Sequence, residues 1–128
     1  MCSLRDIIIT NNTMVQKAFC NNYSIITADS YLDVLLCARD KIHCGYRLLT
    51  HPMAGSMKPN QTPYRSIVLE EGAGLDCESL RLIESSLDAA QKFYSNCSTP
   101  EWAEGVSADF RVIDLSIITS ALRRRDAQ

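Results

Sequence analysis

The sequence predicts an α/β fold class: one small three-layer domain over residues 1–128, with a mostly parallel sheet of about four strands and C-terminal helices. Short runs of β-branched residues alternate with helical patterns through the first half of the chain. The connections between them are only a few residues long, as in doubly wound folds. A chain of 128 residues suits one domain and buries enough surface for a core without disulfides or metal.

The first strand is predicted over residues 4–10, where an isoleucine-rich run is bounded by two asparagines. A helix should follow and end near Cys20. Two residues are alternative N-caps for it: Thr13, at capping-box spacing from Gln16, and Asn12. The run 23–27 then predicts the second strand.

Ser30, at capping-box spacing before Asp33, predicts the start of a second helix. That helix should end at Gly45, a residue suited to the position just past a helix C-terminus. Its apolar stripe has helical spacing and consists of Tyr31, Leu35, Ala38 and Ile42. The third and fourth strands are predicted over 46–50 and 65–69.

The element order predicts that the first three strands are parallel, in the order 2-1-3. Thr10, Thr27 and Thr50 should then lie at one edge of the sheet. Residues 51–64 leave no room for a crossover helix and its turns. The fourth strand is therefore expected to pair antiparallel or to lie at an edge of the sheet.

The C-terminal third is predicted to be helical. Asp76 caps a long helix, and Pro100 with Glu101 resembles a second helix start that Gly105 interrupts. The segment 110–122 suits a helix by its spacing and a strand by its β-branched residues. We favour the helix, because the alanine and three arginines that follow continue naturally in one.

Charge and cysteine usage narrow the function classes. Thirteen basic and fifteen acidic residues leave no basic field for nucleic acid, and the run 123–125 reads as a solvated helix end. The apolar run 7–9 is far too short for a membrane span or a signal core, so we expect a cytoplasmic protein that binds no membrane. Six cysteines without a Cys-x-x-Cys pair are expected to be reduced and free of metal.

The segment 51–64 is the most unusual part of the chain. It holds three of the four prolines and exceeds the length of about 12 residues above which structureless loops are uncommon and usually functional or disordered. The prolines make it stiff, and it begins at the carboxyl end of a predicted parallel strand, where α/β proteins bind ligands. The candidate ligand-binding residues at this edge are Thr10, Asn11, Asn12, His51, Gly55, Ser56, Lys58, Asn60 and Thr62.

These groups combine a helix start, hydroxyls, an ammonium and an imidazole, a set that suits a small anion. Plainer interpretations stay open: His51 caps the strand, Lys58 is a solvated charge, and Asn11 and Asn12 only cap the helix. No phosphate-loop, dinucleotide, metalloprotease or nucleophile-elbow motif occurs in the sequence. We therefore assign no catalytic residue and expect no cofactor and no metal.

Three segments of the chain carry a family resemblance. They are Ile-Ile-Thr-Asn-Asn at 8–12, Tyr-Arg-Leu-Leu-Thr-His-Pro-Met-Ala-Gly-Ser-Met-Lys-Pro-Asn-Gln-Thr-Pro-Tyr-Arg-Ser at 46–66, and Phe-Arg-Val-Ile-Asp-Leu-Ser-Ile at 110–117. In these segments the chain resembles the GrdX family. The resemblance implies a setting beside the selenium-dependent glycine, sarcosine or betaine reductases of anaerobic amino-acid fermenters, which make acyl phosphates. It carries no catalytic residue over.

Two function hypotheses follow. The first is an accessory or regulatory protein of the reductase system that binds a small anionic metabolite, or a protein partner such as a glycine reductase component, through the segment 51–64. The second is a small enzyme acting on a phosphorylated or carboxylated intermediate, with His51 as acid/base and Lys58 as anion clamp. We favour the first, because the sequence shows no paired carboxylates and no nucleophile with its base. A homodimer is left open.

Overall fold

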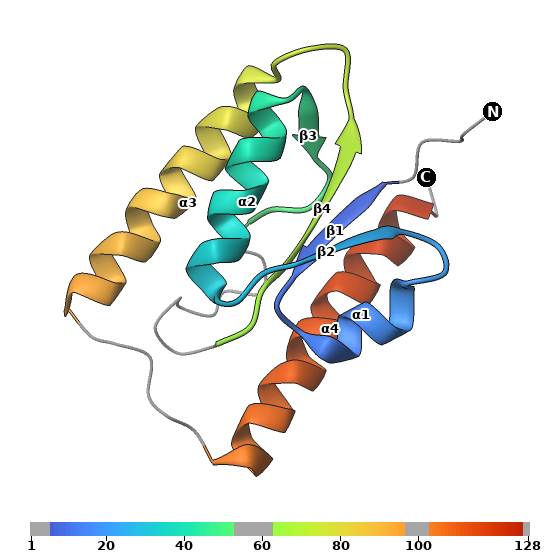
Figure 1. Cartoon of the computed structure of the whole chain (residues 1–128), viewed down its shortest axis with the longest axis vertical. Helices are drawn as coiled ribbons and strands as arrows, with labels where there is room; N and C mark the ends of the chain where they lie inside the picture. Colours follow the sequence, from blue (N-terminus) through green and yellow to red (C-terminus); the bar gives the residue numbers. More distant parts are fainter. Residues whose placement is uncertain (1–5, 53–62, 97–102, 127–128) are drawn as a thin grey trace.

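A computed structural model describes residues 6–52, 63–96 and 103–126. A four-stranded sheet lies between two layers of helices, with α2 and α3 on one face and α1 and α4 on the other (Figure 1). The α/β class and the three layers predicted from the sequence are confirmed. The elements in chain order are β1 (Ile7–Thr10), α1 (Thr13–Phe19), β2 (Ser24–Thr27), α2 (Tyr31–His43), β3 (Tyr46–Leu48), β4 (Ser66–Glu71), α3 (Cys77–Asn96) and α4 (Glu104–Asp126).

The strand order is β2-β1-β4-β3. β1 pairs parallel with β2, which places Thr10 beside Thr27, and antiparallel with β4, which places Thr10 beside Ser66. β3 pairs antiparallel with β4 and therefore runs in the direction of β1. The predicted shared edge for Thr10 and Thr27 is confirmed. Thr50 follows β3 and accepts a hydrogen bond from the Val68 amide at 3.1 Å, on the far side of β4 from β1.

The expected antiparallel pairing of the fourth strand is confirmed, but the prediction that the third strand neighbours the first, with the fourth at an edge, is wrong. β4 is an interior strand, and the sheet is mixed rather than mostly parallel in its pairing. The physical reason is burial. Ile67, Val68 and Leu69 are fully buried and face alternate sides of the sheet, as an interior strand requires. The short β3 exposes Arg47 and suits an edge.

Each face of the sheet has its own core. Successive residues of a strand point to opposite faces, so Ile9 packs toward α2 and α3 while Ile8 packs toward α1 and α4. On the second face, Ile8 meets Ile118 and Leu122 of α4. The segments after β1 and β2 therefore lead to helices on opposite faces, starting from the same edge of the sheet (Figure 1).

Local capping confirms most of the predicted helix ends. Asn12, rather than Thr13, caps α1: its side-chain oxygen accepts from the Met14 amide at 3.0 Å. Ser30 accepts from the Asp33 amide at 3.1 Å and caps α2. Gly45 follows that helix with a φ of +104°, a conformation that side chains disfavour.

The C-terminal segment is one continuous helix, α4, so the prediction of a helix over 110–122 is confirmed. The predicted interruption at Gly105 is wrong. A glycine in a first turn costs about 1 kcal/mol relative to alanine, too little to end a helix that Ile118 and Leu122 anchor. The predicted helix start at Pro100 and Glu101 lies outside the described residues. Within the described ranges, none of the helices combines the length and apolarity needed to cross a membrane.

Candidate functional site

A cleft of about 520 Å³ opens at the carboxyl edge of β1 and β2. The loop from β2 into α2 forms one wall, and the residues that lead into β4 form the other. Its lining residues are Asn11, Asp29, Ser30, Tyr31, Leu32, Pro63 and Tyr64. This is the edge at which α/β proteins bind ligands, and the volume is that of a small-molecule site.

A smaller hollow of about 310 Å³ adjoins the cleft through Asn11, which lines both. The amide of Asn11 bridges two segments of the chain. Its nitrogen donates to the Pro63 carbonyl at 2.6 Å, and its oxygen accepts from the Arg65 amide at 2.9 Å. Asn11 thus joins the loop after β1 to the end of the segment 51–64 and holds that wall of the cleft.

A hydrogen-bonded cluster lies on the α4 side of the same edge. The Thr10 and Ser66 hydroxyls are 2.7 Å apart, and Ser66 donates to the Asp114 carboxylate at 2.7 Å. Asn12 donates to the same carboxylate at 3.1 Å and to the Arg111 carbonyl at 2.9 Å. All four side chains are buried. Their polar atoms serve to attach α4 to the sheet, so for Asn12 the structural interpretation is supported.

Burial raises the pKa of the Asp114 carboxyl above its usual value, and the hydrogen bonds from Ser66 and Asn12 only partly offset that rise. Asp114 is therefore a carboxyl whose ionised form the fold disfavours. Its place inside the packing, rather than on the cleft wall, makes it part of the scaffold.

Two tyrosines among the cleft's lining residues each contact an arginine. Arg65 is 2% exposed, and its guanidinium carbon lies 5.2 Å from the centre of the Tyr31 ring. Arg111 donates to the Tyr64 hydroxyl at 2.8 Å, lies 5.6 Å from the centre of its ring and also pairs with Glu104. Such contacts are favourable cation–π interactions and hold each ring in place.

Burial also raises the pKa of the Tyr31 phenol, while the charge of Arg65 and its hydrogen bond to the phenol act in the opposite direction. A phenol oxygen that accepts a hydrogen bond from a guanidinium keeps its own O–H as a donor. Tyr31 is itself only 2% exposed and lies in the core behind the cleft, so Tyr64, which is half-buried and lies beside the charge of Arg111, is the phenol at the cleft wall.

The structure brings only part of the predicted site together. Thr10, Asn11 and Asn12 meet at the carboxyl edge, while His51 is exposed and follows β3, across β4 from β1. Gly55, Ser56, Lys58, Asn60 and Thr62 lie outside the described residues, so their role stays a prediction.

Sequence reasoning missed the cleft residues Asp29, Tyr31 and Tyr64. The edge rule applied to the first strand holds equally for the second, so the residues after β2 carried a usable signal. Arg111 and Asp114 carried none, because each lies about a hundred positions from its Asn12 contact, with separations of 99 and 102. Only the fold brings such residues together.

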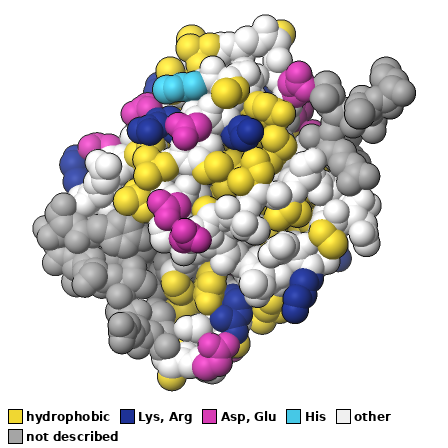
Figure 2. Space-filling model, in the orientation of Figure 1, with side chains coloured by type: hydrophobic (Ala, Val, Ile, Leu, Met, Phe, Trp, Pro, Cys, Tyr) yellow, Lys and Arg dark blue, Asp and Glu magenta, His cyan; other side chains and the backbone are white. Residues whose placement is uncertain are grey.

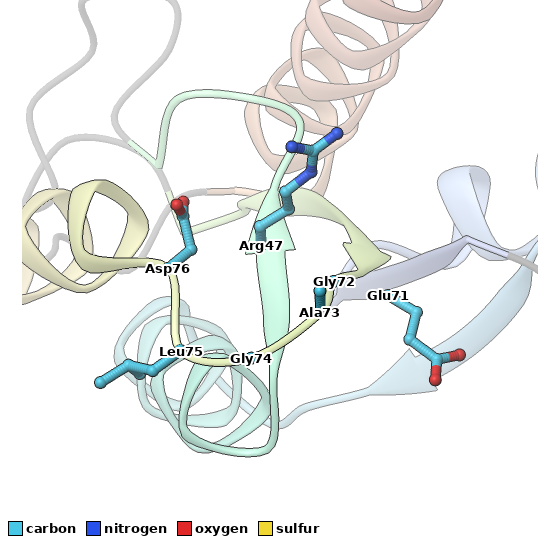
Figure 3. A pocket seen from close by; sticks show the side chains of 7 residues that line it. All are labelled: Arg47, Glu71, Gly72, Ala73, Gly74, Leu75 and Asp76. Atoms are coloured by element: carbon cyan, nitrogen blue, oxygen red, sulfur yellow. The ribbon is translucent and has the colours of Figure 1, made fainter.

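A second hollow, of about 740 Å³, lies where the chain leaves β4 and passes β3 (Figure 3). Figure 3 shows the side chains of Glu71 and Leu75 pointing outward on opposite sides of it. Arg47 pairs with Glu70, with a nitrogen–oxygen distance of 2.6 Å, and Asp76 caps α3 by accepting from the Ser79 amide at 3.1 Å. Arg47 and Asp76 are thus both engaged in contacts that stabilise the fold, so this hollow is a weaker candidate for a ligand site than the cleft.

Four cysteines lie among the described residues, Cys20, Cys37, Cys44 and Cys77, and each is a free thiol. The part of the chain that the structure describes holds no group of three metal-ligating side chains. None of these four thiols is among the lining residues of the cleft. The reduced state of all six cysteines stays a prediction.

Positive and negative side chains lie interspersed on the face of the molecule shown in Figure 2, with hydrophobic side chains between them. Nucleic-acid binding typically uses a continuous basic field. The described side chains on this face do not form one, in keeping with the net charge of −2.

Comparison with known proteins gives one match. The family model of the GrdX-like proteins matches residues 7–123, which span every strand, every helix start and both walls of the cleft. No curated protein and no solved structure matches the chain. The match covers nearly the whole sequence and includes the segments 46–66 and 110–117, so this chain belongs to the GrdX-like protein family.

Proposed function

We propose that this protein is a cytoplasmic, non-catalytic accessory or regulatory protein of a glycine, sarcosine or betaine reductase system. It binds a small anionic metabolite in the cleft between the start of α2 and Pro63–Tyr64, together with the segment 51–64. The observation that carries the proposal is the half-buried Tyr64 on the cleft wall, which Arg111 holds in place. Membership of the GrdX-like family supports the reductase setting.

The chemistry of the cleft suits an oxyanion. Tyr64 places a hydroxyl on the cleft wall beside the charge of Arg111, and hydrogen bonds to charged acceptors are stronger than neutral ones. The start of α2, a helix of 13 residues, forms the facing wall and adds the partial positive charge of a helix N-terminus.

Asp29 limits which anions fit. Its carboxylate lines the same cleft and repels a ligand of high negative charge. A ligand that carries an ammonium group beside its carboxylate offers a partner to Asp29 as well as to Tyr64. The lining therefore favours the carboxylate of an amino acid, or a singly charged acid, over a multiply charged phosphate.

Binding is favoured over catalysis by what the cleft lacks. Its described lining contains one carboxylate and no histidine or cysteine, so no nucleophile–base pair is formed there. His51 follows β3, on the other side of β4 from the β1–β2 pair. The enzyme hypothesis would need His51 to meet a second reactive group inside a pocket.

The test is calorimetric titration of the full chain with glycine, sarcosine, betaine, acetate, acetyl phosphate and inorganic phosphate. Tyr64→Phe removes one donor and keeps the ring, so it should raise the dissociation constant of the bound ligand about two- to tenfold. Tyr46→Phe, on β3 and away from the cleft, is the matched control and should leave binding unchanged. No binding by any of these compounds, or equal effects of the two variants, would refute the proposed cleft.

The segment 51–64 is tested separately through its lysine. If Lys58 clamps the anion, Lys58→Ala should weaken binding by about 1.5–3 kcal/mol, the value of one charge-assisted hydrogen bond, and leave the melting temperature unchanged. Each titration mixture is then examined by nuclear magnetic resonance for chemical conversion. Turnover that disappears in His51→Ala would favour the enzyme over the binding protein.

A further inference from the structure

The smaller hollow beside the cleft, of about 310 Å³, differs from the cleft in its chemistry. Its lining consists of three threonines, two asparagines, a glutamine and an alanine, so it contains hydroxyls and amides but no charged side chain. The cleft, in contrast, has the carboxylate of Asp29 and the Tyr64 hydroxyl beside Arg111. The two spaces therefore suit different parts of a ligand, a charged part in the cleft and an uncharged polar part in the hollow.

The hollow and the cleft lie on opposite faces of the same sheet edge. Ile8 and Ile25 point toward α1 and α4, and residues two apart on a strand share a face, so Thr10 and Thr27 point toward that side as well. The cleft lies on the α2 side, because its residues 29–32 lead into that helix (Figure 1). Since β1 and β2 lead to helices on opposite faces, the two spaces form the crevice in which open α/β sheets bind ligands.

The two spaces are close enough to hold one small molecule. Asn11 lines both of them. Ala28 lines the hollow and the next residue, Asp29, lines the cleft, and the Cα atoms of consecutive residues are about 3.8 Å apart. A ligand whose charged end contacts Asp29 and Tyr64 therefore needs only a short side chain to enter the hollow.

Three side chains of the hollow are available to such a ligand. Thr10 and Asn12 are already engaged in the buried hydrogen bonds that attach α4 to the sheet. Thr13, Gln16 and Thr27 are exposed, and their side chains make no hydrogen bond to another described residue. Two hydroxyls and a primary amide offer donors and acceptors together, which is the combination that a carboxamide requires.

We propose that the hollow holds the side chain of an amino acid whose ammonium and carboxylate groups lie in the cleft, and that this side chain ends in a carboxamide. The inference rests on the proposed function, because it takes the cleft as the site of the charged end. A charged side chain would find no opposite charge in the described lining of the hollow. An aliphatic side chain would displace water from its hydroxyls and amides without replacing those hydrogen bonds. The ligand class is therefore that of asparagine and glutamine.

Calorimetric titration of the full chain with a matched series of amino acids tests the ligand class. Asparagine, leucine and aspartate have side chains of nearly the same shape that end in an amide, two methyl groups and a carboxylate. Asparagine should bind about tenfold more tightly than the other two, because a site with hydrogen-bonding groups rejects analogues that cannot pair with them. Glutamine and glutamate form a second pair, one methylene longer. Glycine should bind more weakly than the preferred amide, since it occupies the cleft alone.

A substitution in the hollow tests its contribution directly. Thr27→Val replaces a hydroxyl with a methyl group of the same shape, so it should raise the dissociation constant of the preferred amide about two- to tenfold and leave that of glycine unchanged. Ser24→Ala is the matched control, because it removes a hydroxyl from the other end of β2, away from the hollow, and should change neither constant. Tyr64→Phe, in the cleft, should weaken the binding of glycine and of the amide to the same degree.

The outcomes separate the hollow from the cleft. Amino acids that bind without a preference for the amide, or with a preference that Thr27→Val leaves intact, would overturn the role of the hollow and keep the cleft. Binding of acetate without any amino acid would do the same. No binding of any of these compounds would overturn both. An amide whose binding is weakened by Thr27→Val and not by Tyr64→Phe would support the hollow and refute the cleft as the site of the charged end.

Discussion

On one face of the sheet, α2 and α3 attach through an extended cluster of buried apolar side chains that includes Ile9, Leu35 and Ile83. On the other face, α1 and α4 attach through a smaller apolar cluster and the hydrogen-bonded group around Asp114. The first attachment is non-directional and depends on buried area. The second depends on donor and acceptor geometry and on one buried carboxyl. The two faces should therefore respond differently to substitution and to pH.

The largest expected effect is on the apolar face. Leu35→Ala should lower the free energy of unfolding by about 2–5 kcal/mol, because a fully buried leucine leaves a cavity that the packed helices cannot close. Urea denaturation measures the loss. Leu75→Ala, at a position 53% exposed, is the control and should change the free energy of unfolding by less than about 0.5 kcal/mol. Equal losses would mean that α2 does not form this core.

On the polar face, the chemistry of the substitution should matter more than the volume removed. Asp114→Ala should lower the free energy of unfolding by about 1–3 kcal/mol, because Asn12 and Ser66 lose a buried acceptor. Asp114→Asn keeps an acceptor oxygen of the same shape and should lower it by less than about 1 kcal/mol. Urea denaturation of the two variants measures the difference. Similar losses of unfolding free energy in both would mean that the hydrogen bonds to Asp114 do not stabilise this face.

The free energy of unfolding should depend on pH in the direction expected for a buried carboxyl whose pKa is raised by folding. Folding favours the protonated form of Asp114, so its contribution to stability is fully present below 3.8, its usual value, and is lost as the pH rises through the raised folded-state pKa. The wild-type free energy of unfolding should therefore fall relative to that of Asp114→Asn across this window. Measuring both proteins at each pH cancels the contributions of other carboxyls, and a difference that rises with pH would contradict the assignment.

The smallest effect should come from the edge of the sheet. The Arg47–Glu70 pair lies on β3, with more than half of the arginine side chain exposed. Arg47→Gln should lower the free energy of unfolding by no more than about 0.5 kcal/mol, because exposed ion pairs are screened by water and salt. A larger loss in urea denaturation would show that β3 contributes to the fold through this pair rather than through its backbone.

The cleft shows which of the predicted rim residues the structure brings together. The carboxyl edge of the first strand was predicted as the site, and Asn11 does line the cleft there. His51 was predicted at the same rim, but β4 separates its strand from β1. The rim was inferred from the order 2-1-3, so the error in strand order misplaced His51 relative to the first strand, while ligand binding by the predicted residues stays a prediction.

The sequence alone was sufficient to predict the α/β class, the approximate strand and helix positions, the cap at Ser30 and the helix end at Gly45, while at the start of α1 it left Thr13 and Asn12 as alternatives. Each of these depends on side chains and backbone amides within a few positions of each other, so local pattern is sufficient. The interior position of β4 and the contacts of Asp114 with Asn12 and Ser66 could be seen only in the folded structure. Those outcomes depend on burial and on contacts between residues far apart in the chain, which the folded arrangement alone brings into reach.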